Sequence, residues 1–299
     1  MNCQMIDVER IVRRMRGGSQ AYLVQGSDRK FYVAKFVGNP QGTRTLINEW
    51  IATQMFRRFG ITAPELVVLR LEPSRLMELP PIFEFGTRKL PISAGLHLGS
   101  LCPVHPEKEA IFDFLPAHLV GKTVNLAEFA KVLVIDTFLG HADSRQAVFV
   151  RDRSRRELSF RAYFIDHGLV FDGSNWKFKD LADRSLYFDR KIYSMIDTTH
   201  HCEQALEALA SVSVDELRST ARDIPREWFG PVDADHLVQL FTMLHKRLES
   251  VRSLVSERLQ LLGLRIPQSP TASVQFQTKR PQTVKLDTTL IDSPAPVAS

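Results

Sequence analysis

Five short segments of this chain have the residue types that bind and transfer a phosphate group. Three lie near the start of the 299-residue chain: a glycine-rich segment at 17–19, then Lys35, then Glu49. The other two lie much further along, at Asp143 and at the Asp-His-Gly triplet of 166–168. Each segment alone is a common turn, surface or helix feature. Their order along the chain indicates a nucleotide–metal site.

Phosphoryl transfer depends mainly on positioning and on the neutralisation of charge. Glycines let backbone N–H groups approach phosphate oxygens. A lysine on a strand supplies a positive charge for the phosphates, and a glutamate on the next helix holds that lysine in place. An aspartate that follows a helix can orient the attacking hydroxyl and accept its proton. An aspartate before a glycine at a strand end can hold a metal that bridges the phosphates.

The elements that must position Lys35 and Glu49 are visible as hydrophobic patterns. The β-rich runs at 21–25 and 31–36, separated by a polar turn, predict a hairpin whose second strand carries the lysine. An apolar stripe over 43–59 predicts the helix that carries the glutamate. A strand is expected at 65–71, and a short amphipathic helix at 7–15.

The second half of the chain is predicted to be mostly helical. A helical pattern over 126–139 leads directly to Asp143, and two short strands, 147–150 and 162–165, lead to Asp166. Further helical patterns follow at 203–212, at 214–223 and, as one long helix, at 234–262.

The composition is that of an ordinary globular protein, with 44% apolar and 24% charged residues. No run approaches the roughly 20 apolar residues that span a bilayer. The first residues show no secretory signal, and the three cysteines are far apart, so we expect a reducing, cytoplasmic location. The net charge of +5 is mild, so no membrane partner and no direct binding of nucleic acid are expected.

These residues resemble the bacterial-type HipA-like kinase family, in particular its short branch without the extended N-terminal region of the HipA toxins. The resemblance extends over about residues 8–260, which is nearly all of the chain except its C-terminal end. The matching segments are GGSQAYLV at 17–24, YVAKF at 32–36, LINEW at 46–50, GLHLGS at 95–100, DTFLGHADSRQ at 136–146 and IDHG at 165–168.

The resemblance implies an α+β, bilobal protein-kinase-like fold. We expect a mostly-β N-lobe with one main helix at 1–100 and a mostly-α C-lobe at 101–265. The remaining segment, 266–299, is rich in Pro, Ser, Thr and Gln, and this composition predicts a disordered tail.

The resemblance also implies ATP and Mg²⁺ as cofactors, with transfer of the γ-phosphate to a Ser or Thr hydroxyl of a protein substrate or of the chain itself. An antitoxin or a regulatory protein is a further candidate partner. Carried over position by position, the phosphates are covered by Gly17, Gly18, Ser19 and Gln20 and contacted by Lys35, which pairs with Glu49; Asp143 is catalytic and Asp166 binds the metal.

One position departs from the wider kinase pattern, which has a metal-binding asparagine five residues after the catalytic aspartate. That position is Val148 here, and an aliphatic side chain cannot bind Mg²⁺, which requires oxygen ligands. Either Gln146 or Ser144 takes over this role, or the chain is a pseudokinase that binds nucleotide and acts by protein interaction. The triplet His141-Ala142-Asp143 leaves a third alternative, a small-molecule kinase.

Other reactive residues are expected to be structural. The run 200–202, His-His-Cys, resembles a metal cluster, but adjacent helical residues point about 100° apart and rarely bind one ion together. Arg145 is expected to be solvated on the surface, and Cys102 to be a small buried residue. The resemblance places 97–101 near the nucleotide hinge.

Overall fold

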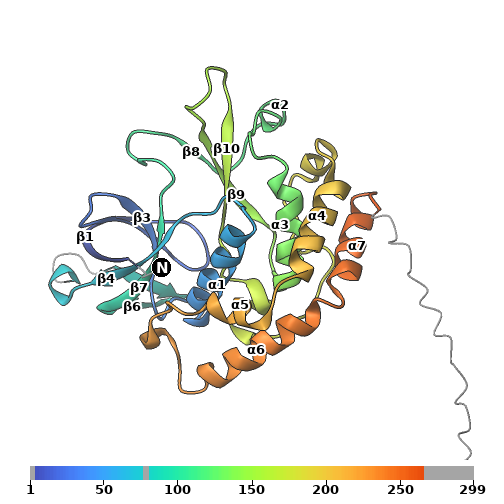
Figure 1. Cartoon of the computed structure of the whole chain (residues 1–299). Coiled ribbons are helices and arrows are strands. Elements are labelled where there is room, and N and C mark those ends of the chain that lie inside the picture. The colour runs from blue at the N-terminus through green and yellow to red at the C-terminus, as the bar shows by residue number, and fades with distance from the viewer. Residues whose placement is uncertain (1–3, 77–80, 266–299) are drawn as a thin grey trace, which may run out of the picture. The chain divides into compact units, whose positions relative to one another are not determined.

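Five strands from the first hundred residues close into a small barrel (Figure 1). In this computed structural model, which describes residues 4–76 and 81–265, the barrel order is β1-β2-β3-β7-β4. All neighbouring strands are antiparallel except β1 and β4, which are parallel. The strands are β1 (Met5–Arg14), β2 (Tyr22–Gly26), β3 (Phe31–Lys35), β4 (Leu66–Leu71) and β7 (Gly95–Leu101).

The helix predicted at 7–15 is wrong, because this segment is strand β1. Ile6 and Val8 are buried, as alternation in a strand requires, but the register with β2 shifts twice further on, between Val8 and Arg10 and between Ile11 and Arg13. At each irregularity the regular alternation of side chains between the two faces of the sheet is interrupted. The apolar residues therefore acquire spacings of three, which imitate a helix.

Helix α1 (Arg44–Arg58) lies between the barrel and the helical part of the molecule (Figure 1). The prediction of a helix over 43–59 is confirmed to within one residue at each end. Gly60 follows with φ of 65°, a left-handed conformation that glycine adopts without steric cost. The hairpin predicted around 26–28 is confirmed as β2 and β3.

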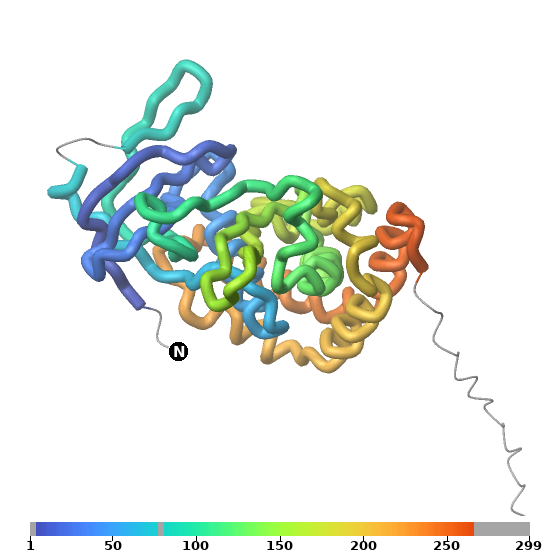
Figure 2. The backbone as a smooth tube through the Cα atoms, turned by 90° about the horizontal axis from the view of Figure 1, so that it is seen from above, coloured from blue at the N-terminus to red at the C-terminus, as the bar shows by residue number. Residues whose placement is uncertain are grey.

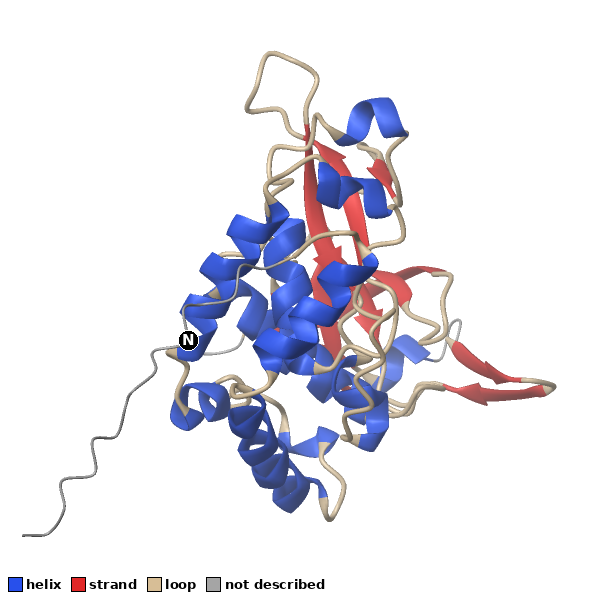
Figure 3. Cartoon of the chain, turned by 90° about the vertical axis from the view of Figure 1, so that its right-hand side faces the viewer, coloured by secondary structure: helices blue, strands red, loops and turns tan. Residues whose placement is uncertain are grey.

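Helices dominate the rest of the chain, around the three-stranded sheet β10-β9-β8 (Figure 3). The predicted strands around the basic turn and the helix before Asp143 are confirmed as β9, β10 and α3. The bounds are β8 (Ile111–Phe112), α2 (Ala117–Val120), α3 (Glu128–Leu139), β9 (Gln146–Arg151), β10 (Phe160–Ile165), α4 (Thr198–Ala210), α5 (Val214–Ser219), α6 (Asp233–Arg247) and α7 (Val251–Leu261).

Short elements complete the described part of the chain. A small hairpin extends from the barrel (Figure 2). It consists of β5 (Ile82–Phe85) and β6 (Arg88–Pro91); the 3₁₀ turns are η1 (Pro73–Leu76), η2 (Val170–Asn175), η3 (Arg190–Ser194) and η4 (Arg226–Trp228).

The single long helix predicted over 234–262 is wrong, because the chain turns between α6 and α7. The N–H groups of Leu248, Glu249 and Ser250 each bond to the carbonyl three residues earlier, which tightens the helix into a turn. Arg247, at this turn, donates to the carbonyls of Phe138 and Thr137 at the end of α3. Contacts with a distant part of the chain therefore determine where α6 ends, and the local sequence pattern does not show them.

Two cores hold this arrangement together. One fills the barrel, and the larger one joins α1, α3 and the C-terminal helices. Everything that the structure describes lies in one compact unit, 1–266, so the α+β class is confirmed while the division at residue 100 stays a prediction. The predicted tail, 266–299, lies outside the described residues. Within the described ranges, none of the helices has the length and apolar character to cross a membrane.

Candidate active site

Lys35, Glu49 and Asp166 meet in space although they are far apart in sequence. Lys35 ends β3, Glu49 lies in the middle of α1, and Asp166 directly follows β10. The Nζ atom of Lys35 lies 2.7 Å from Oε2 of Glu49 and 2.8 Å from Oδ1 of Asp166. Lys35 is 8% exposed and Glu49 is 3% exposed, so water screens this ion pair only weakly.

The ammonium group of Lys35 and the carboxylate of Asp166 shift the pKa values of one another. Burial alone would lower the pKa of Lys35, but the charges of Asp166 and Glu49 outweigh burial and raise it above the usual range. The charge of Lys35 in turn lowers the pKa of Asp166, against the effect of burial. Lys35 and Asp166 are therefore both ionised near neutral pH.

The Asp-His-Gly triplet can approach α1 because its third residue has no side chain. A Cβ atom at Gly168 would lie 3.3 Å from the carbonyl oxygen of Thr45 and 3.5 Å from Oε2 of Glu49. Asp166 itself has φ of 60°, a strained conformation of the kind that is enriched at functional sites. Glycine at 168 thus allows Asp166 and Glu49 to share one lysine.

Asn48 holds the segment after Asp166 against α1, and sequence reasoning missed this role. Its fully buried amide donates to the carbonyls of Gly168, Val170 and Gly173, at 2.9, 3.1 and 2.8 Å. Its carbonyl oxygen accepts from Nε1 of Trp176. An asparagine within an apolar helical face, next to Glu49, was the available signal.

Asp143 lies in the loop after α3 and is linked to Asp166 through a buried histidine. Gly140 ends α3 in the left-handed conformation, and the Asp143 carboxylate accepts a hydrogen bond from the N–H of Ser144 at 2.7 Å. The ring of His141 contacts the carbonyl oxygen of Asp143 at 2.9 Å and that of Asp166 at 3.3 Å. Burial, followed by the charge of Arg145, lowers the pKa of His141, so the ring is neutral near pH 7 and can donate a hydrogen bond to only one of these two carbonyl oxygens.

Arg145 is buried, so its predicted surface position is wrong. Its guanidinium pairs with Asp136 of α3 through two hydrogen bonds of 2.7 and 2.8 Å. It also donates to the carbonyl of Ile165, the residue before Asp166, and contacts the ring of His167. Arg145 therefore fixes the backbone directly before Asp166 and so helps to position that aspartate. Asp136, an acidic residue within the mostly apolar stretch 132–139 of α3, was a signal in the sequence that a buried basic partner exists.

Gln146, rather than the residue at 148, contacts the predicted metal-binding aspartate. The Nε2 atom of Gln146 donates to Oδ2 of Asp166 at 3.1 Å. Val148 is 9% exposed and pairs with Tyr163 across the β9–β10 ladder. Ser144 contacts Asp143 through its backbone instead. Of the two substitutes that the sequence offered, Gln146 is the one at Asp166.

The glycine-rich segment is the turn between β1 and β2. Gly17 has φ of 117°, which requires glycine. A Cβ atom at Gly18 would lie 3.0 Å from Nε2 of Gln41, so this turn lies over the loop that leads into α1. The side chain of Gln20 bonds to the backbone of Glu84 in β5, and Ser19 is buried. The turn thus reaches the loop next to α1, while Gln20 is directed toward the projecting hairpin.

The residues present fit a divalent metal that is bound together with phosphates. Asp166 carries a carboxylate and Gln146 beside it carries an amide oxygen, and both are ligand types that Mg²⁺ accepts. Within the described residues there is no group of three or more His, Cys, Asp or Glu side chains that would hold a metal alone. Mg²⁺ commonly binds one or two carboxylates plus substrate phosphates, so this donor set is sufficient only with a nucleotide.

The other reactive residues have structural positions. His97 is buried, accepts from the N–H of Val37 through Nδ1, and has a pKa lowered to about 4 by burial. Cys102 is partly buried, and burial raises its pKa to about 12, so it is a weak nucleophile. His200 and His201 lie on α4, where their rings are 5.5 Å apart.

Comparison with known proteins agrees with the motifs. The model of the HipA-like kinase family matches residues 8–114, which supports the resemblance found in the sequence over the first third of the chain. No curated protein sequence matches the chain significantly. The crystal structure of the Golgi casein kinase with Mn/ADP bound is similar at a TM-score of 0.47 and 12% identity, over 89% of this chain and 76% of that chain. A second crystal structure of the Golgi casein kinase gives a TM-score of 0.41 and 11% identity, over 84% of this chain and 72% of that one.

Proposed function

We propose that the chain is an ATP- and Mg²⁺-dependent kinase that transfers the γ-phosphate to a serine or threonine hydroxyl of a protein substrate or of itself. The observation that carries this proposal is the contact of one buried lysine, Lys35, with both Glu49 and Asp166. A lysine fixed between a helix glutamate and a strand-end aspartate has the charge and position that phosphate groups require. The match to the HipA-like kinase family supports the same reading.

In this proposal the chain has an N-lobe at 1–100 and a C-lobe at 101–265. The last barrel strand, β7, ends at Leu101, which supports a division there. Lys35 and Glu49 come from the first part, and Asp143 and Asp166 from the second. Nucleotide would then be held between groups from both parts.

Each residue has a distinct role in the proposed transfer. Lys35 would contact the phosphates, and Glu49 holds its ammonium group in place. Asp166, with Gln146 beside it, would hold Mg²⁺, which would neutralise charge on the phosphates. Asp143 accepts the proton of the attacking hydroxyl, and His141 fixes the backbone of that loop relative to Asp166.

Incubation of the purified chain with labelled ATP, Mg²⁺ and protein acceptors tests the proposal. Asp143→Asn and Asp166→Asn should each abolish incorporation of label. The matched control is Asp215→Asn, since that carboxylate is 91% exposed on α5 and should be dispensable. Label that survives both site substitutions would refute the assignment.

Val148 favours a second candidate, a pseudokinase that binds nucleotide and acts through a protein partner such as an antitoxin or a regulatory protein. In that case ATP should raise the melting temperature by linkage without measurable transfer. If Gln146 supplies the missing oxygen, wild type should transfer phosphate and Gln146→Ala should lower the rate. Efficient turnover by wild type excludes the pseudokinase.

A small-molecule kinase is the third candidate, and the triplet His141-Ala142-Asp143 is the feature that favours it. In the structure this histidine braces the backbones of Asp143 and Asp166, which is compatible with either acceptor. A screen of metabolites as phosphate acceptors distinguishes a small-molecule kinase from a protein kinase. Acceleration of ATP consumption by one small alcohol or amino sugar, with no labelled protein, would favour this candidate over the proposed function.

A further inference from the structure

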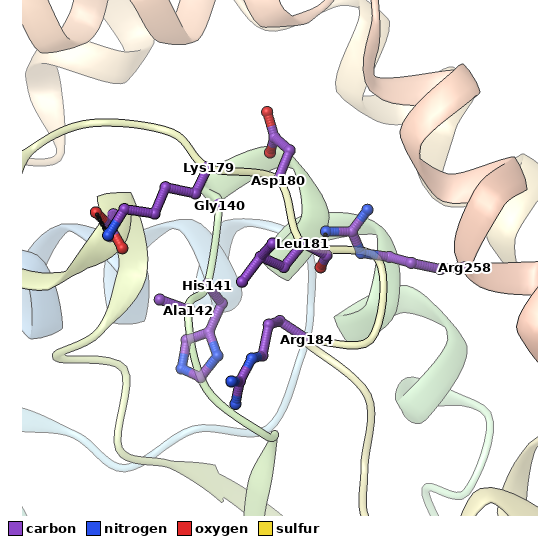
Figure 4. A pocket seen from close by; sticks show the side chains of 9 residues that line it. Gly140, His141, Ala142, Lys179, Asp180, Leu181, Arg184 and Arg258 are labelled. Atoms are coloured by element: carbon purple, nitrogen blue, oxygen red, sulfur yellow. Dashed lines mark hydrogen bonds and ion pairs between the residues drawn. The ribbon is translucent and has the colours of Figure 1, made fainter.

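A pocket of about 220 Å³ is lined in part by residues of the loop that leads to Asp143 (Figure 4). Its wall includes Ala142, which directly precedes Asp143, and the ring of His141. In Figure 4 the side chain of Arg258 enters from α7, and that of Arg184 lies toward His141. The rest of the wall is Gly140, Asp172, Lys179, Asp180 and Leu181.

Arg258 brings a positive charge into the interior without a carboxylate partner of its own. The residue is 1% exposed, and its two Nη atoms donate only to the carbonyls of Leu254 and Leu181, at 3.0 and 3.1 Å. Its Nε atom is buried and has no hydrogen-bond partner. Burial also lowers the pKa of Arg258, although a guanidinium stays charged. A buried charge without a counterion is costly, so the pocket favours an anion.

The carboxylates of the wall are already engaged. Asp180 accepts two hydrogen bonds, of 2.6 and 2.7 Å, from Arg247, which reaches it from α6. Asp172 forms an ion pair with Lys179 at 2.9 Å, although the same buried oxygen, Oδ2, has no hydrogen bond of good geometry. Neither carboxylate forms a hydrogen bond to Arg258, although the charge of Asp180 partly offsets the effect of burial on the pKa of Arg258.

Arg184 is the second cation without close compensation. Its nearest acid is Asp183, at 3.9 Å with a side chain that is 67% exposed, so this pair is long and screened by water. Like Arg258, Arg184 has a buried Nε–H with no hydrogen-bond partner. Neither arginine has a hydrogen-bonded carboxylate, and the side chain of Arg184 is 41% exposed, so its guanidinium can be reached from solvent. Two positive charges therefore remain for a ligand, which matches a phosphate group that carries nearly two negative charges.

We propose that this pocket binds the phosphate group of a phosphoserine or phosphothreonine in the peptide substrate. The inference rests on the proposed function, because it makes the chain a kinase for substrates that are already phosphorylated. The side chains of Lys179 and Leu181 at the wall are largely exposed, so a peptide can enter from solvent. Since Ala142 lies in the wall, a residue held there places its neighbours along the peptide near Asp143.

The test measures peptide binding without ATP, by fluorescence anisotropy at physiological salt. The probes are a labelled degenerate peptide pool with one fixed phosphoserine and the same pool with serine. Wild type should bind the phosphoserine pool about tenfold more tightly, and Arg184→Gln should remove most of this preference because a charged hydrogen bond is lost. Arg222→Gln is the matched control, since that arginine is exposed on another part of the chain and should keep the preference.

Arg258→Gln should have the same effect as Arg184→Gln, provided that its melting curve shows a folded protein. Equal binding of both pools by wild type, or a preference that survives Arg184→Gln, would overturn the inference. Inorganic phosphate is the third probe: if it raises the melting temperature through Arg184 while the phosphoserine pool shows no preference, the pocket holds the free ion and the substrate proposal falls.

Kinase activity is read separately, so that the two proposals can fail independently. An Arg184-dependent preference in a chain that never transfers phosphate supports the pocket and refutes the proposed function. With an active chain, Arg184→Gln should raise KM for a phosphoserine peptide and leave KM for ATP unchanged. Active transfer with no preference between the pools refutes the pocket alone.

Discussion

Replacement of Lys35 by methionine should destabilise the fold by leaving a buried carboxylate without its partner. Glu49 has a side chain that is 4% exposed, and its hydrogen bond to Lys35 is 2.7 Å long. Removal of one partner of a buried ion pair costs about 3–5 kcal/mol, most of it from the charge left behind. The side chain of Asp166 is 34% exposed, so water solvates it and most of the cost arises at Glu49.

The free energy of unfolding, measured by urea denaturation at pH 7, tests this reasoning. Lys35→Met should lose about 3–5 kcal/mol, whereas Lys30→Met, on the exposed turn of the same hairpin, should change stability by less than about 0.5 kcal/mol. The double variant Lys35→Met/Glu49→Gln removes the stranded charge as well. It should therefore be at least about 1 kcal/mol more stable than Lys35→Met alone.

The pH dependence of the free energy of unfolding gives a second, independent test of the same reasoning. In wild type the pKa of Asp166 is lowered, so its contribution to stability is present above about pH 4 and is lost as the pH falls through the folded value. In Lys35→Met, acidification neutralises the stranded carboxylates and removes their cost. The difference between the two proteins should therefore shrink between pH 7 and pH 4. Equal stability of the single and double variants, or a difference independent of pH, would refute the buried-charge account.

Three further substitutions test the groups that position the site. Gly168→Ala places a methyl group 3.3 Å from the backbone carbonyl oxygen of Thr45 in α1, which is a tight contact, and should reduce the rise in melting temperature caused by ATP and Mg²⁺. Asp136→Asn leaves Arg145 buried without its carboxylate and should lower the free energy of unfolding by about 3–5 kcal/mol in urea titrations. Asn48→Ala should cost about 1–3 kcal/mol, since three carbonyls lose a donor, and should speed hydrogen exchange after residue 168.

Local patterns were sufficient for the elements that carry the site. The strand with Lys35, the helix with Glu49 and the helix before Asp143 each have a period, a turn signal or a glycine stop that short-range physics explains. The meeting of Lys35, Glu49 and Asp166 could be predicted only from the order of the motifs, because no spacing relates residues on three different elements.

The errors arose where contacts distant in sequence override the local pattern. Strand β1 needs β2 and β4 beside it, and its register shifts disguise the alternation of a strand. The break before α7 depends on Arg247, which reaches the end of α3. Arg145 resembled a surface residue because its partner, Asp136, lies nine residues earlier in the sequence, across the last turn of α3 and a loop.

The segment after Asp166 links the two sites. Asp166 at its start belongs to the proposed nucleotide site, while Lys179 and Arg184 further along line the proposed phosphate pocket. Several of its residues have positive φ, among them Phe171 and Asp172, and such strain persists only where the surroundings enforce it. The hydrogen bonds of the Asn48 amide hold much of this segment in place. A loss of its amide should therefore weaken both ATP-induced stabilisation and the preference for phosphoserine peptides, whereas Arg184→Gln should affect the peptide alone. If Asn48→Ala leaves both unchanged, the segment is held by other contacts and the two sites are independent.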